Sequence, residues 1–411
     1  MREREREKER VRTDAPGHEA GDRPRSPLPD PLHSPSPSPR EPSPRLGSLD
    51  AFRGLTVAAM LLVNNPGTWS AIYPPLRHAE WHGWTPTDLI FPFFLFIVGV
   101  SMAFSLVRRL ESGAGRGALL RKAARRAAIL FALGLVMHAF PDYLHLSHLR
   151  IPGVLQRIAL AYLAATLILL GTRRRGQFVA AALLLAGYWL LVTRVPVPGS
   201  GPGVLEPGRD LGAWIDRAVF GEAHLWASSG TWDPEGLLST LPAIATVLTG
   251  LFAGYLLRGP LPVTRKLASL IGAGLLLTGA GLAWNASFPI NKSLWTSSYV
   301  LFTSGLAFLA LAACWLLIDV RGIRRWAAPF VAFGMNAIAA FFLSGLFARG
   351  LTLIRLPAGT ETVPLKTLIY RSLFEPAGPP ALASLLFALT FVLVWMVLMA
   401  ALYRRRIFFT V

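Results

Sequence analysis

Long apolar stretches alternate with short polar segments over most of the chain, starting near residue 50. Each stretch has about the length that a helix needs to cross a hydrocarbon core ~30 Å thick. A soluble α/β protein would instead show short apolar runs between amphipathic helices. The pattern predicts an all-α, polytopic helical bundle with about ten transmembrane helices. The predicted spans are 51–65, 86–107, 126–140, 151–171, 178–193, 237–257, 267–286, 297–318, 328–347 and 381–403.

The segments between these spans fall into two alternating sets. One set is short and rich in Lys and Arg: 108–126, 172–177, 258–266, 321–325 and 404–406. The other set is longer and poorer in these residues: 66–85, 141–150, 194–236, 287–296 and 348–380. Since cytoplasmic loops of membrane proteins collect Lys and Arg, the alternation predicts that both termini are cytoplasmic and that the second set lies outside.

The composition agrees with a membrane domain. Of the 411 residues, 53% are hydrophobic and 16% are charged, against roughly 25% charged in a soluble domain. The net charge of +18 suggests nucleic acid, but the basic residues form scattered clusters and not one face, so nucleic acid is excluded as a partner. The single cysteine, Cys314, excludes an intramolecular disulfide framework and a cysteine-rich metal site.

Residues 1–46 differ in kind from residues 47–411, which hold the predicted membrane domain. Arg and Glu alternate near the start, and the run SPSPSPREPSP follows. So few apolar residues predict a disordered tail. The tail has no apolar core of a signal peptide, so cleavage is not expected. A translation start placed too early is an alternative explanation.

The predicted outer loops carry polar side chains with tryptophans between them. This mixture suits a carbohydrate, whose hydroxyls form hydrogen bonds and whose C–H faces stack on indole rings. The alternative for the tryptophans is an aromatic belt at the membrane surface. The candidate substrate-binding residues are Trp81, Asp88, Trp232, Asp233, Asn291 and Lys292.

Two of these acids also have the pattern of helix caps. Thr85-Pro86-Thr87-Asp88 places an N-cap, a proline and an acid three residues on, ahead of the second span. Asp233-Pro234-Glu235 has the same appearance ahead of the sixth span. For both acids, capping is the alternative to binding.

His78 is the best candidate for a general base, because a neutral imidazole at an aqueous boundary titrates near working pH. His82 lies four residues later, and on a helix the two would share a face that suits a metal. Pro74, Pro75 and Gly83 argue against a helix there, and no third ligand is nearby. We therefore expect no metal.

Charged residues also occur at or inside the predicted spans. Asp50 and Arg53 are spaced as an ion pair where the first span begins. Gln156 and Arg157 fall inside the fourth span. An arginine within a membrane faces the bundle interior, which makes it a functional candidate, although a structural salt bridge is the alternative.

These residues lie in segments that resemble a known family. Six segments carry the resemblance: SLDAFRGLTVAAMLLVNN, RHAEWHGWTPTDLIFPFFLFIVGVSM, IPGVLQRIALAY, WDPEGLLSTLPAIATVLTGLFAG, NKSLWTSSYVLFTSGLA and FVAFGMNAIAAF. They are similar to the catalytic membrane domain of heparan-α-glucosaminide N-acetyltransferases and their bacterial relatives. The resemblance covers roughly residues 46–347. The stretch from RHAEWHG to DLIFP is its most specific part.

The resemblance implies an acetyltransferase that takes acetyl from cytosolic acetyl-CoA and places it on an amino sugar or glycan outside. It implies that His78 is the active histidine and that Asn64, at the outer end of the preceding helix, assists it. Arg157, Arg53 and Gln156 are the candidates for holding acetyl-CoA. A direct transfer with His78 as base and an acetyl-histidine intermediate are both compatible with these residues.

The resemblance further implies the inner membrane of a bacterium, and a homodimer as in the lysosomal enzyme. The acceptor, and whether it is acetylated at nitrogen or oxygen, stay open. The alternative function is a transporter or flippase of a sugar or lipid-linked glycan, which would also use intramembrane charges and outer aromatics. His78 distinguishes the two hypotheses, because a carrier does not need an outward-facing base.

Overall fold

The computed structural model describes residues 46–141, 143 and 146–409. The predicted tail, 1–46, lies outside the described residues except for Leu46. The longer helices are α1 (Gly47–Asn64), α2 (Ile90–Met102), α4 (Arg116–Ala139), α5 (Val154–Gly171), α6 (Arg174–Arg194), α8 (Thr240–Arg258), α9 (Val263–Trp284), α10 (Ser297–Trp315), α12 (Ala337–Leu353) and α14 (Pro380–Arg404). The shorter helices are η1 (Pro74–Leu76), η2 (Pro86–Leu89), η3 (Ala103–Val107), α3 (Arg108–Glu111), η4 (Leu146–His148), α7 (Leu211–Phe220), η5 (Glu222–His224), η6 (Leu316–Val320), α11 (Ala328–Met335), α13 (Leu365–Ile369), η7 (Tyr370–Phe374) and η8 (Glu375–Ala377).

The predicted multi-pass helical architecture is confirmed. Within the described residues, seven helical segments are long and apolar enough to cross a membrane, and the bent pair α11–α12 would make an eighth. Helices α1 and α4 occupy the first and third predicted spans but carry charged side chains, Asp50 and Arg53 in the former and Arg125 and Arg126 in the latter. The count of ten spans and the cytoplasmic position of both termini stay predictions.

Three details differ from the sequence-based expectation. Helix α4 begins at Arg116, so much of the basic segment expected as a loop is helical; its alanine, leucine, lysine and arginine residues favour a helix. The predicted span 328–347 is two helices that meet at an angle of 80°. A two-stranded antiparallel hairpin, β1 (Arg355–Ala358) and β2 (Glu361–Pro364), lies in the last predicted outer loop.

The bend between α11 and α12 lies at Asn336, which is fully buried. The Asn336 side chain donates to the carbonyl of Ile407 at 3.1 Å and accepts from the amide of Phe409 at 2.9 Å. Residues 407–409 thus pack against the bend between α11 and α12, where the Asn336 side chain satisfies two of their backbone groups.

Glycines allow two helix pairs in the centre to pack closely. A Cβ atom at Gly99 of α2 would lie 1.9 Å from the carbonyl of Val247, and one at Gly250 of α8 would lie 1.9 Å from the carbonyl of Phe96. Gly54 of α1 meets α11 in the same way. Small residues are the usual means of bringing helices together in a membrane, where the apolar solvent gives no hydrophobic driving force.

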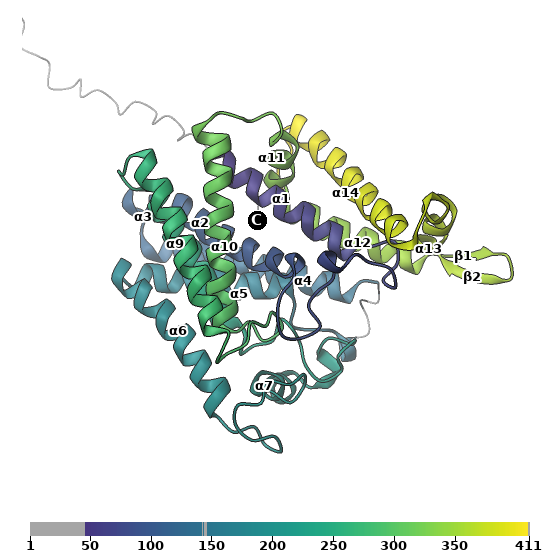
Figure 1. Ribbon diagram of the computed structural model, residues 1–411, viewed down its shortest axis with the longest axis horizontal. Helices are drawn as coiled ribbons and strands as arrows, with labels where there is room; N and C mark the ends of the chain where they lie inside the picture. Colours follow the sequence, from purple (N-terminus) through teal and green to yellow (C-terminus); the bar gives the residue numbers. More distant parts are fainter. Residues whose placement is uncertain (1–45, 142, 144–145, 410–411) are drawn as a thin grey trace, which may run out of the picture. The chain divides into compact units, whose positions relative to one another are not determined.

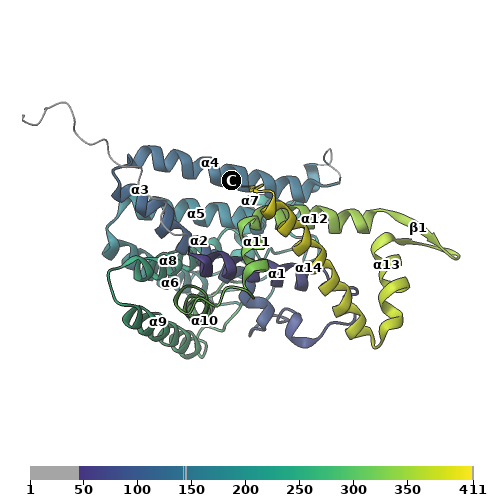
Figure 2. The ribbon, with the colours of Figure 1, turned by 90° about the horizontal axis from the view of Figure 1, so that it is seen from above.

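The helices differ in how deeply they are packed. The candidate spans that contain α2, α8 and α10 have most of their apolar windows buried, whereas those of α6, α9 and α14 are mostly exposed. Figure 1 shows α6, α9 and α14 at the edge of residues 46–409. Helices α4 and α5 run side by side (Figure 2). The exposed apolar faces of the peripheral helices are the surface expected to meet lipid.

Three of the predicted outer loops meet one another. The amide of Gly83 donates to the carbonyl of Ile290 at 2.8 Å, and the indole N–H of Trp81 donates to the carbonyl of Leu205 at 2.6 Å. The meeting of these loops agrees with the prediction that they share one side of the membrane.

Candidate active site

His78 and Asp88 form a hydrogen-bonded pair at the start of the second span. His78 Nδ1 lies 2.6 Å from Asp88 Oδ1. The His78 side chain is 46% exposed, whereas Asp88 is 1% exposed. A buried carboxylate on Nδ1 favours the tautomer that carries its proton there, which leaves Nε2 as the unprotonated, basic nitrogen.

Backbone and capping bonds hold the Asp88 carboxylate. Its Oδ2 atom accepts from the amides of Ala79 and Thr85, both at 3.0 Å. Thr85 and Asp88 form the predicted capping box around η2. The capping prediction is confirmed, and the same carboxylate also contacts His78. Capping therefore fixes the position of the group that orients the imidazole.

Lys292 joins this pair from a loop 214 residues further along the chain. Its Nζ atom lies 3.1 Å from His78 Nδ1 and 3.2 Å from His78 Nε2, and 3.8 Å from Asp88 Oδ1. Burial lowers the pKa of Lys292, although the Asp88 carboxylate opposes the shift. The site thus places a base, a carboxylate and an ammonium donor within hydrogen-bonding reach of one another.

Asn64 is the last residue of α1 and its side chain is exposed. Within the described part of the chain it makes no hydrogen bond, and none joins it to His78. Its neighbour Asn65 donates to the carbonyl of Leu61 at 2.8 Å. The structure therefore brings Lys292, and not Asn64, into contact with the histidine.

The predicted Trp81 and Trp232 belong to one cluster with Trp226. The rings of Trp81 and Trp232 lie 5.0 Å apart, and those of Trp226 and Trp232 lie 5.6 Å apart, both edge to face. The cluster joins the first and third of the predicted outer loops. Trp69 is 62% exposed, more than any other tryptophan among the exposed large hydrophobic residues. Indole rings thus serve loop packing in this cluster, and Trp69 is left at the surface.

Asp233 belongs to a buried ion pair. Arg150 donates from Nε and Nη2 to the two oxygens of Asp233, at 2.8 and 2.7 Å, and also to Glu235. The prediction that Asp233 caps the next helix is wrong, because α8 begins at Thr240. Sequence reasoning did not single out Arg150, since its partners lie more than 80 residues away.

Asn291 is fully buried and supports the loop that presents Lys292. Its side-chain oxygen accepts from the amide of Leu294 at 2.9 Å, and its nitrogen lies 3.3 Å from His82 Nδ1. Burial lowers the pKa of His82. His78 and His82 therefore have separate partners, and within the described residues no group of three or more His, Cys, Asp or Glu side chains is placed to hold a metal ion.

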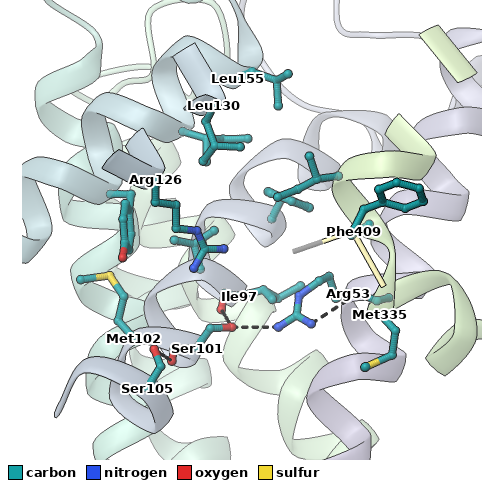
Figure 3. Close-up of a pocket in the computed structure, with 17 residues that line it drawn as sticks. Arg53, Ile97, Ser101, Met102, Ser105, Arg126, Leu130, Leu155, Met335 and Phe409 are labelled. Atoms are coloured by element: carbon teal, nitrogen blue, oxygen red, sulfur yellow. Dashed lines mark hydrogen bonds between the residues drawn. The ribbon is translucent and has the colours of Figure 1, made fainter. Parts of the chain in front are cut away.

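A cavity of about 290 Å³ lies between α1, α2, α4, α5 and the α11–α12 bend. Arg53 and Arg126 line it, and Figure 3 shows their guanidinium groups pointing into the same space from α1 and α4. Arg53 forms the predicted ion pair with Asp50 at 2.9 Å and donates to Ser101 at 2.8 Å. Phe409, near the end of the chain, lies on the cavity wall.

A second cavity, of about 420 Å³, adjoins the first. The two share Ser105, Arg126 and Tyr162. The second is strongly basic, with further lining residues Arg109, Lys122 and Arg125. Sequence analysis counted these residues as part of a cytoplasmic cluster and missed them as a site, because only the fold of α4 against α5 turns them toward a common space.

Gln156 and Arg157 do not line either cavity. Arg157 is 1% exposed and donates to the carbonyl of Gly236 at 3.0 Å and to the hydroxyl of Ser239. Its guanidinium lies 5.0 Å from the ring centre of Trp295, a cation–π contact. Gln156 Nε2 lies 3.4 Å from a ring nitrogen of His138. Of the three predicted acetyl-CoA ligands, Arg53 alone faces the cavities.

Comparisons with known proteins agree with the resemblance in the sequence. A family model described as "Heparan-alpha-glucosaminide N-acetyltransferase, catalytic" matches residues 45–261. The heparan-alpha-glucosaminide N-acetyltransferase of Homo sapiens is 32% identical over 352 residues, which are 72% of this chain and 52% of that protein. The Mus musculus protein of the same name is 31% identical over 351 residues, 72% of this chain and 53% of its own. The chain thus spans about half the length of the curated relatives it matches.

Proposed function

The chain belongs to the heparan-α-glucosaminide N-acetyltransferase catalytic family, and from this membership we propose that it is a membrane-embedded acetyltransferase. It moves acetyl from cytosolic acetyl-CoA to an amino sugar or glycan on the outer side of a bacterial inner membrane. The observation that carries the proposal is the contact of His78 with Asp88 and Lys292. A carrier has no need of a histidine oriented in this way, so the structure favours an enzyme over a transporter.

The two basic cavities are the proposed site for the acyl donor. Coenzyme A carries its phosphates at one end and its thioester at the other. Arg109, Lys122, Arg125 and Arg126 would hold the phosphates by charge-assisted hydrogen bonds. The adjoining cavity beside Arg53 leads the thioester arm between the helices. Whether Arg157 and Gln156 also contact the donor stays a prediction.

In the proposed reaction His78 Nε2 takes a proton from the acceptor amine as its nitrogen attacks the thioester carbon. The new C–N bond forms, the C–S bond breaks, and the CoA thiolate leaves and takes up the proton from the imidazolium. Asp88 stabilises the imidazolium through Nδ1. In the alternative, His78 Nε2 attacks the thioester carbon, the C–S bond breaks and the CoA thiolate leaves. The acceptor amine then attacks the acetyl-histidine, the bond from the acetyl carbon to Nε2 breaks, and the amine proton passes through the released imidazole to the thiolate.

Negative charge develops on the thioester oxygen in either route, and a nearby donor would stabilise it. Asn64 is the donor that the family resemblance implies. Lys292 is a second candidate, because its ammonium is already beside His78. A protonated Lys292 has three N–H donors. Since His78 Nδ1 donates to Asp88, Lys292 can donate to the ring only at Nε2. In the reaction it would turn from Nε2 to the substrate oxygen, which leaves Nε2 able to take the proton.

The acceptor would bind where the exposed His78 ring and the tryptophan cluster of the outer loops come together. Trp81 offers its ring edge beside Trp232, and both belong to the loops that surround the histidine. We propose that they contact the sugar. Asp233 and Asn291, each satisfied by protein partners, would shape the loops around it.

Thioester cleavage by the purified protein tests the proposal. Labelled acetyl-CoA is mixed with the protein alone, with glucosamine, with glucosamine-containing oligosaccharides or with unmodified glycans. Free thiol and labelled product should appear only in the mixtures that contain a true acceptor. Rapid quenching of the same reaction would reveal an acetylated protein if the acetyl-histidine route holds. Transport of labelled glycan into vesicles with no thiol release would instead support the carrier.

A further inference from the structure

A third cavity, of about 660 Å³, lies between α6, α8, α9 and α10. Its walls are almost wholly apolar, and Phe178, Leu185, Phe252, Leu276 and Leu277 are among the lining residues. Its volume falls within the range of specific ligand pockets, ~300–1,000 Å³. It shares no lining residue with the two basic cavities.

This groove opens on the surface expected to face lipid. Phe178 of α6 is 54% exposed and Leu276 of α9 is 72% exposed, although both line the groove. Helices α6 and α9 are also the candidate spans with the smallest buried shares, 28% and 17%. Water does not fill an apolar space of this kind, and in a bilayer a hydrocarbon chain is the neighbour that can.

One end of the groove carries positive charge. Arg174, the first residue of α6, is the only charged side chain among the described residues that line it. Its guanidinium lies 4.6 Å from the ring centre of Tyr255, whose hydroxyl donates to Gln177 at 2.9 Å. These contacts hold Arg174 at the mouth of the groove. Arg173 and Arg175 beside it are exposed.

The other charged groups around this end are mostly basic, and the acidic Glu111 is paired with Arg258. Helix α8 ends at Arg258, whose side chain bonds to Glu111, and α9 begins beside Arg265 and Lys266. Within the described residues, no acidic side chain lines the groove. An apolar channel with a basic end is complementary to a lipid that has an acyl chain and an anionic phosphate.

We propose that this groove binds an anionic phospholipid, with an acyl chain between α6, α8 and α9 and the phosphate at Arg174. Arg173 and Arg175 add attraction to the same headgroup. The predicted topology places these arginines at the cytoplasmic surface, where anionic lipids attract basic residues. Because the groove and the acetyl-transfer site share no residues, this inference stands apart from the proposed function.

Native mass spectrometry of the full-length protein in detergent tests the proposal. Phosphatidylglycerol or phosphatidylcholine with identical acyl chains is added at equal concentration, and the bound fraction of each is measured. Wild-type protein should prefer phosphatidylglycerol. Arg174→Gln should weaken that binding about fivefold, the factor expected for one basic residue near an anionic surface. Arg194→Gln, at the other end of the same helix, is the matched control and should leave it unchanged.

Tryptophan substitutions that fill the groove test the contribution of the acyl chain to binding separately from that of the headgroup charge. Leu276→Trp and Ala182→Trp, both on the groove wall, should reduce binding of both lipids. Leu183→Trp is the control, because Leu183 is 67% exposed on α6 but does not line the groove. If Ala182→Trp fails to fold, Leu276→Trp carries the test, since its side chain is already largely exposed.

Three results would overturn the proposal. Equal binding of the two lipids to wild-type protein would show that the site does not recognise an anionic headgroup. Unchanged lipid binding to the Leu276→Trp variant would show that the acyl chain does not lie in this groove. Displacement of phosphatidylglycerol by coenzyme A, at concentrations that saturate acetyl transfer, would assign Arg174 to the nucleotide.

Discussion

The outer His78 site and the basic cavities differ in how their charged groups are satisfied. His78, Asp88 and Lys292 lie within hydrogen-bonding distance of protein partners, and these contacts join two segments of the chain. In the cavities, Arg53 is paired with Asp50, but the buried Nε atom of Arg126 has no hydrogen-bond partner within the described residues. The cavities also have volumes of about 290 and 420 Å³.

The difference indicates two kinds of work. Proton transfer gains from groups that are already oriented, because no reorganisation is then needed in the transition state. Binding a large, highly charged donor requires space and unsatisfied cations, since the ligand itself supplies the missing acceptors. Changes in the outer site should therefore lower turnover, and changes in the cavities should raise the Michaelis constant for acetyl-CoA.

Replacing His78 should have the largest effect. His78→Ala should lower the rate of transfer by about 10²–10⁴-fold, the usual contribution of a general base, while acetyl-CoA affinity stays the same. The measurement is steady-state turnover together with donor binding by calorimetry. His82→Ala is the control and should cost far less, because His82 contacts Asn291 and not the catalytic pair. A His78→Ala protein with near wild-type turnover would falsify the enzyme proposal.

Lys292 and Asn64 compete for the role of stabilising the thioester oxygen. Loss of the true donor should lower turnover by about 10²–10³-fold. We expect this from Lys292→Met, whereas Asn64→Ala should have a smaller effect, because its exposed side chain has no partner near His78. Turnover of the two variants at saturating acetyl-CoA decides between them. A larger loss of turnover in Asn64→Ala than in Lys292→Met would show that Asn64 is the residue that stabilises the thioester oxygen.

Asp88→Asn should lower turnover by about 10–100-fold, which corresponds to the ~1.5–3 kcal/mol of a hydrogen bond to a charged group. The amide cannot stabilise the imidazolium, so the loss should appear in turnover and not in donor affinity. Asp88→Glu should restore part of it. Thr85→Ala, which removes the cap but keeps the carboxylate, should cost about 1 kcal/mol of stability with little loss of turnover. Equal loss of turnover in both variants would point to a purely structural role.

In the cavities, Arg126→Gln should raise the Michaelis constant for acetyl-CoA by about 10–100-fold, again from one charge-assisted hydrogen bond. Turnover at saturation should change little. Arg157→Gln is the comparison, because Arg157 is buried against Trp295 and lines neither cavity. We expect it to lower thermal stability more than donor affinity. An equal loss of affinity in both variants would extend the donor site to Arg157.

The smallest effect concerns the pH dependence of stability in the outer loops. Burial raises the pKa of Asp216, on α7, from 3.8 to about 7. Between pH 4 and 7 the folded state therefore holds a proton that the unfolded state has released, so stability should fall as pH rises through this window. Asp216→Asn keeps an acceptor for the amide of Leu237 and should flatten this dependence. The check is the unfolding temperature from pH 5 to 8, with Glu206→Gln, at an exposed position, as control.

Much of the architecture and part of the site could be predicted from the sequence because their causes are local. A membrane-spanning helix satisfies its own backbone and needs only a continuous apolar stretch, so most of the spans could be located from composition. The capping box at Thr85 and Asp88 and the pair of Asp50 with Arg53 span three residues each. Such short-range patterns carry their own geometry.

Only the tertiary structure decided which distant residues meet. Nothing in the sequence around Lys292 indicates that it contacts His78, since 214 residues separate them. The basic residues of α4 become part of a cavity only when that helix packs beside α5. Likewise, the bend at Asn336 depends on hydrogen bonds to the end of the chain. Each of these features arises from the packing of separate segments, whose free energy is not encoded in any one stretch of sequence.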